Sequence, residues 1–363
     1  MTSSRPERVA VVGTGLVGAS VAMAAGRVGA SVRGWDQDPE RLSRAAARSG
    51  MGPAADLEDC LADADLVVVC APIEAVPALV ARCLAAGPGT LVTDVASIKG
   101  RVVAETRGVA GSERFVPGHP MGGSERSGPE HAAPSILDGI VWVQTPTEET
   151  EPASVERLSD WVASLGARPV VMDAARHDRL VAFVSHLPQV ASTTLMELAA
   201  TEEADEPEIL LLAAGGFRDL TRLAASNPSL WSGILLANRE AIVPALDLYA
   251  GRLAELRRLV AEDRADELEA IFDRAKRARL TLAAKPTVRA GVAVLQVPVP
   301  DRPGALAELT RTMAEGGVNI EDLQIVHSPE GGRGTVHLTV AATEAEAASE
   351  VLAAGSFDPT RLA

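Results

Sequence analysis

A glycine-rich turn near residue 13 constrains the fold more than any other feature of the chain. Gly13-Thr14-Gly15-Leu16-Val17-Gly18 follows a short apolar run, Arg8–Val12, and precedes a helix-like run, Ala19–Gly29. Between a strand and a helix, this G-x-G-x-x-G spacing is typical of the first βα turn of a dinucleotide-binding fold. Its glycines permit a tight turn and bring backbone N–H groups against a pyrophosphate at the positive helix end. The sequence therefore predicts a nucleotide-binding α/β unit.

An acidic residue after the second expected strand bears on the cofactor. Ser31–Trp35 reads as that strand, and Asp36 ends it. A carboxylate there can accept hydrogen bonds from both ribose hydroxyls and would repel a 2′-phosphate, which favours NAD over NADP. Asp36 and Asp38 could instead cap the helix that begins near Pro39, and Asp38 fits that role better. The cofactor is expected to be NAD, held by Gly13, Thr14, Gly15, Leu16, Val17, Gly18 and Asp36.

Strands and helices continue to alternate up to about residue 172. Apolar strands are expected at Leu66–Cys70 and Leu91–Val95, with a helix from about Ile73 to Leu84 between them. Ser97 follows the later strand, where the carboxyl ends of parallel strands meet the ligand crevice. It could also serve only as a helix N-cap. A strand at 140–144, a helix at about 151–165 and an edge strand at 169–172 complete the unit.

One segment combines a histidine with helix-breaking neighbours. It reads Gly118-His119-Pro120-Met121-Gly122-Gly123-Ser124-Glu125-Arg126-Ser127-Gly128. Pro120 and the glycines exclude a helix interior, so we expect a loop that lets side chains approach a ligand closely. Prolines and glycines also build ordinary turns. The motifs before and after this segment favour a functional site, with His119 as its candidate residue.

From Asp173 to about Lys285 the pattern is helical and carries two polar clusters. In the first, His177-Asp178 precedes Ser185-His186-Leu187-Pro188-Gln189, although histidines on helices are more often packed or solvated than catalytic. The second is Gly215-Gly216-Phe217-Arg218-Asp219-Leu220-Thr221-Arg222. A guanidinium in such an apolar region suits a carboxylate anion, because its fork binds one bidentately. An internal ion pair would account for Arg218 with Asp219 but would leave Arg222 for a ligand.

The helices from Leu230 onward have wide apolar faces. Helices this apolar outside a compact core indicate a subunit interface, and a symmetric homodimer is the commonest arrangement. The apolar positions include Ile234, Leu235, Leu236, Ile242, Val243 and Leu246.

A small third region follows a linker at Lys285-Pro286. Val292–Val299 alternates as a strand, a turn follows, and Ala305–Glu315 is an amphipathic helix. A strand from Val318, a hairpin around 328–334, a strand at 335–340 and a last helix from Glu344 complete it. This β-α-β-β-α order predicts a ferredoxin-like α+β unit whose final strand is short or absent.

Charge and composition limit the possible partners and compartment. A formal charge of −15 argues against nucleic acid, which requires clustered Lys and Arg. No apolar run reaches the ~18–20 residues of a membrane span, and the polar N-terminus shows no signal peptide. The three cysteines, Cys60, Cys70 and Cys83, lack metal-type spacing. We therefore expect a cytoplasmic protein with buried or free thiols and no metal.

Taken together, these motifs resemble the prephenate/arogenate dehydrogenase family of tyrosine biosynthesis, with a C-terminal ACT domain. The resemblance spans roughly residues 8–285 and rests on the glycine-rich turn, Asp94-Val95-Ala96-Ser97-Ile98-Lys99, the segment around His119, Ser185-His186-Leu187-Pro188, and the cluster ending at Arg222. It implies a Rossmann-type NAD-binding domain at 7–172, an all-α substrate and dimerisation domain at 173–286, and a ferredoxin-like ACT domain at 291–363.

The resemblance also implies a mechanism. Prephenate would lose a hydride to NAD⁺, its hydroxyl proton and CO₂, giving 4-hydroxyphenylpyruvate. His119 would be the base, since the ordinary pKa of histidine lies near neutrality, with Ser97 aligning it. The implied substrate contacts are Arg222 for a carboxylate, His186 and Gly215, with Glu125 and Asp219 in supporting roles. A regulatory ligand, L-tyrosine as the family implies, would contact Asp301, Arg302, Pro303, Gly304, Asn319 and Ile320.

Three other functions remain open at this point. An arogenate dehydrogenase would share the fold and would need a carboxylate for the substrate ammonium. Gln189, just past His186, is neutral and cannot supply that carboxylate, which slightly favours prephenate as the substrate. A non-catalytic amino-acid sensor would have damaged catalytic positions, yet Ser97, His119 and Arg222 are present. A 3-hydroxyacid dehydrogenase would need a lysine base in the helical domain, and none of Lys99, Lys276 and Lys285 is expected on an apolar helix face near the crevice.

Overall fold

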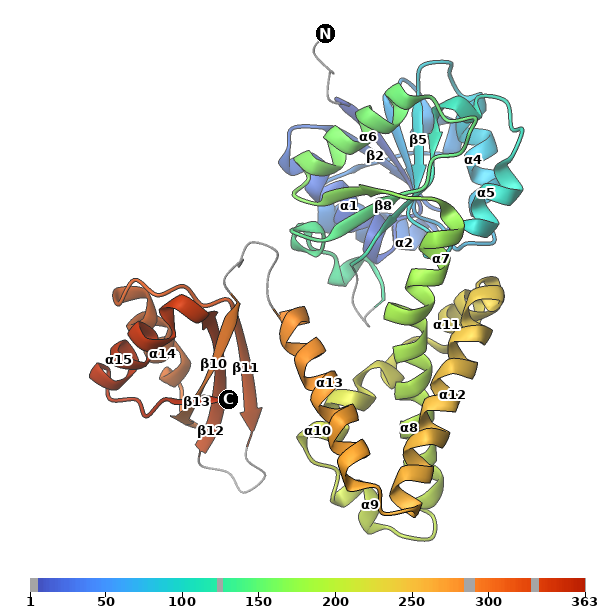
Figure 1. Ribbon diagram of the computed structural model, residues 1–363. Coiled ribbons are helices and arrows are strands. Elements are labelled where there is room, and N and C mark those ends of the chain that lie inside the picture. Colours follow the sequence, from blue (N-terminus) through green and yellow to red (C-terminus); the bar gives the residue numbers. More distant parts are fainter. Residues whose placement is uncertain (1–5, 123–126, 284–290, 328–332, 363) are drawn as a thin grey trace. The chain divides into compact units, whose positions relative to one another are not determined.

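The computed structural model describes residues 6–122, 127–283, 291–327 and 333–362 (Figure 1). The chain divides into two compact units. The first comprises Met1–Leu198 and Thr221–Leu248, and the second comprises Ala199–Leu220 and Tyr249–Ala363. The boundaries between the two units therefore fall inside the helical region that follows residue 173, and not at its ends.

A six-stranded parallel sheet forms the centre of the first unit. Its order is β3-β2-β1-β4-β5-β6, so the chain runs from β1 to one edge and from β4 to the other. The order reverses between β1 and β4, and open α/β sheets bind ligands outside the carboxyl ends of the strands at such a switch point. The strands are β1 Arg8–Val12, β2 Ser31–Trp35, β3 Gly52–Pro53, β4 Leu66–Val69, β5 Leu91–Asp94 and β6 Phe115–Val116.

Helices cover both faces of this sheet (Figure 1). Val9 and Val11 of β1 belong to a core with α1, α2 and α6, whereas Ala10 and Val12 belong to a core with α3, α4 and α5. All four residues are at most 2% exposed, as expected for a parallel strand covered on both sides. The structure confirms the α/β architecture expected from the sequence. The helices are α1 Leu16–Arg27, α2 Pro39–Ser49, α3 Leu57–Leu61, α4 Val76–Ala85, α5 Gly100–Thr106 and α6 Pro152–Ser164.

A second, three-stranded sheet corrects the expectation of a loop at His119. Gly118–Pro120 is a short edge strand, β7, antiparallel to β8 (Val141–Gln144), which pairs in parallel with β9 (Arg168–Val171). Within β7, His119 lies opposite Val143. An edge strand tolerates Pro120 because a proline without an N–H loses nothing on the unpaired side. Short 3₁₀ turns flank these strands at η1 Ser112–Arg114, η2 Pro129–His131 and η3 Pro134–Leu137.

The region after β9 is helical, as predicted. A π-helical turn, η4 Ala182–His186, separates the first two helices. Pro188 accounts for it, because proline cannot donate to the carbonyl of Val184 and its ring clashes there. A small core of Ala182, Ile242 and Ala245 joins this turn to a later helix. The elements are α7 Ala174–Val181, α8 Leu187–Glu202, α9 Glu208–Leu211, α10 Gly215–Thr221, η5 Arg222–Ala225, α11 Pro228–Ala237, α12 Arg239–Ala261 and α13 Ala265–Ala283.

The second unit contains the expected ferredoxin-like sheet, in the order β11-β12-β10-β13 with every pair antiparallel. One face packs on two helices through Leu295, Leu309 and Leu352, which are fully buried. The sequence predicted a final strand that is short or absent, and the structure has a short one, β13. The elements are β10 Val292–Pro300, α14 Ala305–Glu315, β11 Asp322–His327, β12 Arg333–Ala341, η6 Ala342–Glu344, α15 Ala345–Ala354 and β13 Thr360–Leu362.

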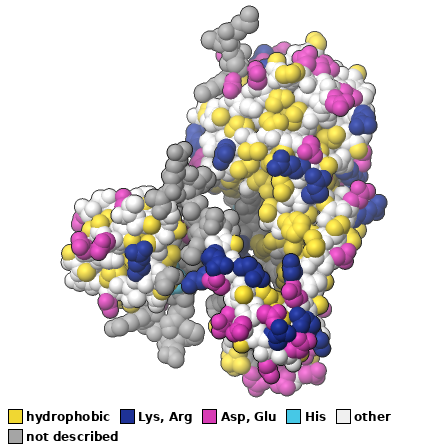
Figure 2. All heavy atoms as spheres, viewed as in Figure 1, with side chains coloured by type: hydrophobic (Ala, Val, Ile, Leu, Met, Phe, Trp, Pro, Cys, Tyr) yellow, Lys and Arg dark blue, Asp and Glu magenta, His cyan; other side chains and the backbone are white. Residues whose placement is uncertain are grey.

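Three further findings concern membrane-spanning helices, surface charge and the cysteines. Among the described residues, no helix combines the length and the apolar character needed to cross a membrane. On the face shown in Figure 2, acidic and basic side chains are interspersed and not separated into fields of one charge. Cys60 and Cys83 are buried free thiols, and burial raises the pKa of each to about 12, so both stay protonated.

Candidate functional site

The glycine-rich turn joins β1 to α1 and has the geometry of a nucleotide cradle. Gly13 has a φ of +94°, and a Cβ there would lie 2.6 Å from the carbonyl oxygen of Cys70. A Cβ on Gly18 would lie 2.0 Å from the carbonyl oxygen of Gly13. Gly15 is different, because a Cβ there would meet nothing within 4 Å. Two glycines thus close the turn, and the third leaves open space at the N-cap of α1, where a pyrophosphate would bind.

Asp36 lies against this turn and is 8% exposed. Its Oδ2 accepts hydrogen bonds from Thr14 N at 2.8 Å and Thr14 Oγ1 at 3.2 Å, and its Oδ1 pairs with Arg41 Nη1 at 3.1 Å. Asp38 instead caps α2, accepting from the backbone of Glu40 and Arg41. The structure therefore favours Asp38 over Asp36 as the cap. An NAD fits these residues, with its pyrophosphate at Gly15 and its ribose beside Asp36.

Cofactor discrimination gives a first prediction. Asp36→Ala should lower the ratio of kcat/KM for NAD⁺ to kcat/KM for NADP⁺ by about 10- to 100-fold, the value of hydrogen bonds to a charged group. The substitution also removes one of the two carboxylate partners of Arg41, which keeps its pairing with Asp38 at 3.5 Å. Initial rates with the two cofactors measure the ratio. Asp38→Ala is the matched control, because it removes a cap but no ribose contact. If Asp36→Ala keeps the wild-type ratio, another residue discriminates between the ribose 2′-hydroxyl of NAD⁺ and the 2′-phosphate of NADP⁺.

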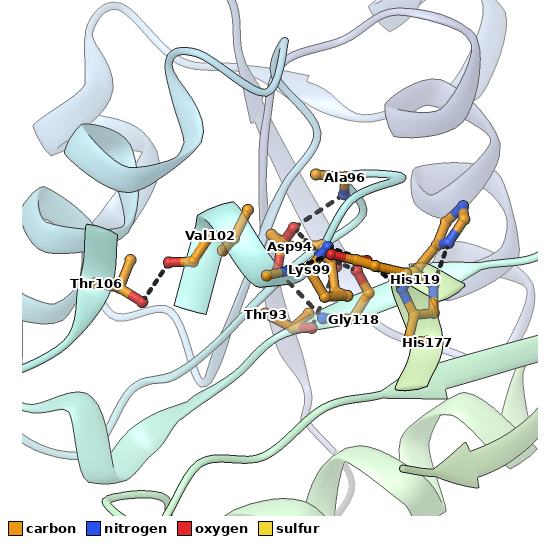
Figure 3. A network of polar contacts seen from close by, with 11 residues as sticks. Thr93, Asp94, Ala96, Lys99, Val102, Thr106, Gly118, His119 and His177 are labelled. Atoms are coloured by element: carbon orange, nitrogen blue, oxygen red, sulfur yellow. Dashed lines mark hydrogen bonds and ion pairs between the residues drawn. The ribbon is translucent and has the colours of Figure 1, made fainter. Parts of the chain in front are cut away.

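A buried ion pair anchors the backbone that carries His119. Asp94, the last residue of β5, pairs with Lys99 Nζ, and both side chains are fully buried (Figure 3). Asp94 Oδ1 accepts from Gly118 N at 3.1 Å, and Lys99 Nζ donates to Gly118 O at 2.6 Å. Burial lowers the pKa of Lys99, and Asp94 opposes that shift. The pair therefore holds both polar atoms of the residue directly before His119.

Two imidazoles face one another beside this pair. His119 Nδ1 lies 2.9 Å from His177 Nε2, with ring centroids 5.1 Å apart and planes at 77° (Figure 3). His177 comes from α7, and its Nδ1 lies 2.8 Å from Asp178 Oδ1. Asp178 also accepts from the backbone N–H groups of Lys99 at 2.9 Å and Gly100 at 2.7 Å. Three groups from a strand and a helix thus form one hydrogen-bonded row that ends on the start of α5.

His186 joins the same cluster from the π-helical turn. It is 1% exposed, and its ring packs edge-on against Trp231 with centroids 6.0 Å apart. Its Nδ1 lies 3.1 Å from Asn238 Nδ2, which also donates to the backbone carbonyl of Asp178 at 2.9 Å. Asn238 therefore ties the His186 side chain to α7, which carries His177 and Asp178.

Burial sets the protonation of these histidines. The pKa of His119 lies well below its ordinary 6.5, first because the ring is desolvated and then because His177, Lys99 and His186 disfavour an added positive charge. Burial also lowers the pKa of His186 to about 4. Both rings are consequently neutral at neutral pH. A neutral imidazole can accept a proton, as the proposed base must.

The other sequence candidates are placed less closely. Ser97 is half-buried between β5 and α5, and it does not cap that helix, whose N-cap is Lys99. Arg222 is exposed at the start of η5, a turn anchored by the hydrogen bond from Gln189 Nε2 to Leu223 O at 2.8 Å. Gly215 and Asp219 are exposed in α10 and belong to the second unit. Glu125 lies outside the described residues.

Gln189 does not support the inference drawn from its neutrality. Its side chain is buried, and its amide bonds to Thr193 and Leu223 within the protein. A side chain committed in this way carries no information about the ammonium or keto group of a substrate.

The predicted effector residues lie around the start of α14. Asp301, Arg302 and Pro303 are exposed in the turn after β10, and Gly304 has a φ of +89° at the helix N-cap. Arg302 pairs with Glu308 at 2.7 Å. Asn319 is exposed and bonds to Glu321, and Ile320 packs on the core of this small domain. All of them belong to the second unit.

Sequence reasoning did not select several residues of the cluster, namely Asp94, Lys99, His177, Asp178 and Asn238. His177-Asp178 was noticed as a pair, but helical periodicity alone does not show that α7 faces β7. Lys99 is the one lysine in the site, reached from the β5–α5 loop and with Nζ bonded to Asp94 and Gly118. A lysine two residues after Ser97, in the segment that follows the β5 strand, was the available signal.

Three family models match successive segments of the chain. Residues 21–171 match the family model of the prephenate dehydrogenase nucleotide-binding domain, and residues 173–274 match that of the prephenate dehydrogenase dimerisation domain. Residues 293–354 match the ACT domain.

Individual relatives and solved structures are named prephenate or arogenate dehydrogenase. The chain is 30% identical over 344 residues to the prephenate dehydrogenase of Bacillus subtilis, covering 92% of each protein. A crystal structure of prephenate dehydrogenase from A. aeolicus in complex with hydroxyphenyl propionate and NAD⁺ is 27% identical, with a TM-score of 0.72 over 77% of this chain and 100% of that one. Synechocystis arogenate dehydrogenase is 29% identical, with a TM-score of 0.65 over 75% of this chain and 98% of that one. The chain therefore belongs to the prephenate dehydrogenase family and is an NAD-dependent oxidoreductase with a dimerisation domain and a C-terminal ACT domain.

Proposed function

We propose that the chain catalyses the NAD-dependent oxidative decarboxylation of prephenate to 4-hydroxyphenylpyruvate. One observation carries the assignment: a neutral, half-buried His119 lies in a hydrogen-bonded cluster that is tied to the end of β5, on the nucleotide-binding sheet. The relative from Bacillus subtilis supports prephenate as the substrate, and the A. aeolicus complex supports the pairing of a hydroxyphenyl ligand with NAD⁺.

The reaction needs one base and one fixed orientation. NAD⁺, held by the glycine-rich turn and Asp36, would supply the hydride acceptor for C4 of prephenate. His119 takes the proton of the C4 hydroxyl as the carbonyl forms, with Ser97 as the aligning hydroxyl. The bond from C1 to the carboxylate then breaks, its electron pair makes the ring aromatic, and His119 returns the proton to the phenolic oxygen. The products are 4-hydroxyphenylpyruvate, CO₂ and NADH, with no net release of a proton.

Product analysis tests this assignment. Purified protein with prephenate and NAD⁺ should form NADH and 4-hydroxyphenylpyruvate in equal amounts, measured by absorbance and by mass spectrometry. NADH without 4-hydroxyphenylpyruvate would mean that a different substrate group is oxidised, and the assignment would be wrong.

Arg222 is proposed as the clamp for a substrate carboxylate, with His186, Gly215, Glu125 and Asp219 as further substrate contacts. Its exposed position on an anchored turn, beside the segment that carries His186, supports this role. Arg222→Ala should raise KM for prephenate by about 10- to 100-fold, the value of a charge-assisted hydrogen bond. Arg101→Ala is the matched control, because Arg101 pairs with Glu105 on the surface of α5 at 2.8 Å. Steady-state kinetics measure both variants, and an unchanged KM for Arg222→Ala would remove the role.

A second substrate, arogenate, remains the alternative. The arogenate dehydrogenase from Synechocystis favours it, because its similarity to this chain is close to that of the prephenate enzymes. The substrate ammonium of arogenate would require a carboxylate partner, for which Glu125 and Asp219 are the candidates.

Assembly and regulation complete the proposal. We propose domains at 7–172, 173–286 and 291–363, and a homodimer through the helical domain. The dimerisation-domain match supports this, as do large apolar side chains that are exposed in the single chain. We also propose L-tyrosine as the effector of the ACT domain, held at Asp301, Arg302, Pro303, Gly304, Asn319 and Ile320. The interface candidates include Phe183 (49% exposed), Val184 (66%), Leu236 (69%), Val243 (53%) and Phe272 (68%).

A further inference from the structure

A second histidine and a carboxylate stand behind His119, on the side of its ring that bears Nδ1. His177 is 1% exposed and Asp178 is 7% exposed, so water has little access to either. Their row runs from His119 Nδ1 to His177 Nε2 at 2.9 Å and from His177 Nδ1 to Asp178 Oδ1 at 2.8 Å. The proposed reaction uses His119 as the base and Ser97 as the aligning hydroxyl, which leaves His177 and Asp178 without a role.

The row fixes where each proton sits. The Asp178 carboxylate can only accept, so the proton between it and His177 belongs to His177 Nδ1. In a neutral His177, Nε2 then carries a lone pair and can only accept. His119 Nδ1 must therefore donate, which leaves the lone pair of His119 on Nε2. This nitrogen points away from the row, so it is the one available to a substrate hydroxyl.

We propose that His177 and Asp178 are positioning residues that hold His119 in the Nδ1–H tautomer and stabilise the charge it acquires when it takes the substrate proton. This proposal rests on the proposed function, in which His119 is the base. The substrate O–H bond breaks and its proton bonds to His119 Nε2. The Nδ1 proton of His119 then moves toward His177 Nε2, which places the positive charge next to Asp178. Both shifts reverse when the phenolic oxygen recovers its proton, so no other reactant is needed.

Asp178 is held by several hydrogen bonds besides the one to His177. Its two carboxylate oxygens accept backbone N–H groups of Lys99 and Gly100, and its own carbonyl accepts from Asn238. A Cβ on Gly100 would lie 2.8 Å from Asp178 Oδ2, so only glycine leaves room for the carboxylate there. Among the described residues, the charged or titratable groups that act on the row include the Lys99–Asp94 pair and His186.

The tautomer can be observed without any activity. The chain has only six histidines, so long-range ¹H–¹⁵N spectra of ¹⁵N-histidine-labelled full-length protein are tractable, and His119→Asn and His177→Asn assign the two signals. At pH 8, above the ordinary histidine pKa of about 6.5, we expect His119 as the Nδ1–H tautomer. Asp178→Ala should weaken the preference for this tautomer, because no carboxylate then fixes the proton on His177 Nδ1. A wild-type His119 in the Nε2–H form would overturn the proposal, whether or not prephenate is the substrate.

Kinetics of a matched pair of variants test the consequence. The amide of His177→Gln reaches the position of Nε2 and can still accept from His119, whereas the amide of His177→Asn reaches only the position of Nδ1. We expect His177→Asn to lower kcat by about 100-fold and His177→Gln by about tenfold or less, with KM nearly unchanged. His131→Asn, an exposed histidine on η2, should behave like wild type.

Coupling to His119 separates this role from a merely structural one. In a His119→Asn background, His177→Asn should cause little further loss of kcat, because both substitutions disable the same base. A full additional 100-fold loss would show that His177 acts independently of His119 and would contradict the proposal. Equal kcat values for His177→Asn, His177→Gln and wild type would contradict it as well.

Discussion

Replacing His119 with asparagine should lower kcat by about 10²- to 10⁴-fold, the usual share of general acid–base catalysis. The reason lies in the site: His119 is the neutral imidazole held between the Asp94–Lys99 pair and His177, and an amide in its place cannot take a proton. Binding of NAD⁺ should be unchanged, because the nucleotide cradle is built from the β1–α1 turn and Asp36.

Steady-state initial rates of NADH formation give kcat, and calorimetric titration with NAD⁺ gives the cofactor Kd. His131→Asn is the control for loss of any histidine from the same unit, since its side chain is exposed. A His119→Asn variant that keeps most of its turnover would remove the base from the mechanism. A variant that loses NAD⁺ affinity would instead indicate damage to the fold.

Asp94→Asn should destabilise the first unit by about 3–5 kcal/mol, the cost of leaving a buried charge without its partner. Both side chains of the Asp94–Lys99 pair are fully buried, and the amide retains the shape of the carboxylate but not its charge. All four tryptophans, Trp35, Trp142, Trp161 and Trp231, lie in the first unit, so their fluorescence during urea unfolding reports on it directly.

Two further variants make this second prediction specific. Asp138→Asn removes the partner of Arg27 in a pair that is about half exposed, and it should leave the urea midpoint close to wild type. Asp94→Leu combined with Lys99→Met should recover much of the lost stability, because a buried pair replaced by apolar groups leaves no uncompensated charge. A change below about 1 kcal/mol for Asp94→Asn would mean that Lys99 is neutral in the folded protein.

The elements that local patterns control could be predicted from the sequence. The β1–α1 turn and the cap at Asp38 depend on residues next to one another, and both lie where their motifs predicted. The strand at Gly118–Pro120 was missed because its pairing with β8 depends on residues more than twenty positions away. Proline argued against regular structure there, yet an edge position removes that objection.

The site was predictable only in part, for a related reason. His119 and His186 could be selected as types of residue in a suggestive context, but their partners come from other elements. The contact between His119 and His177 joins residues 58 positions apart, and that between Asn238 and His186 joins residues 52 positions apart. Periodicity shows that a helix has a buried face, and it does not show which strand that face meets. Gln189 illustrates the opposite error, since its place beside His186 suggested a substrate role although its amide is bonded within the protein.

The most direct test of the proposed activity is the initial rate of NADH formation by the full chain with NAD⁺ and either prephenate or arogenate, with and without L-tyrosine. We expect a kcat/KM for prephenate well above that for arogenate, and a lower rate in the presence of tyrosine. Turnover of arogenate alone would contradict the assigned substrate and would turn attention to Glu125 and Asp219 as partners of its ammonium. Absence of turnover with both substrates would contradict the assignment of His119 as a catalytic base.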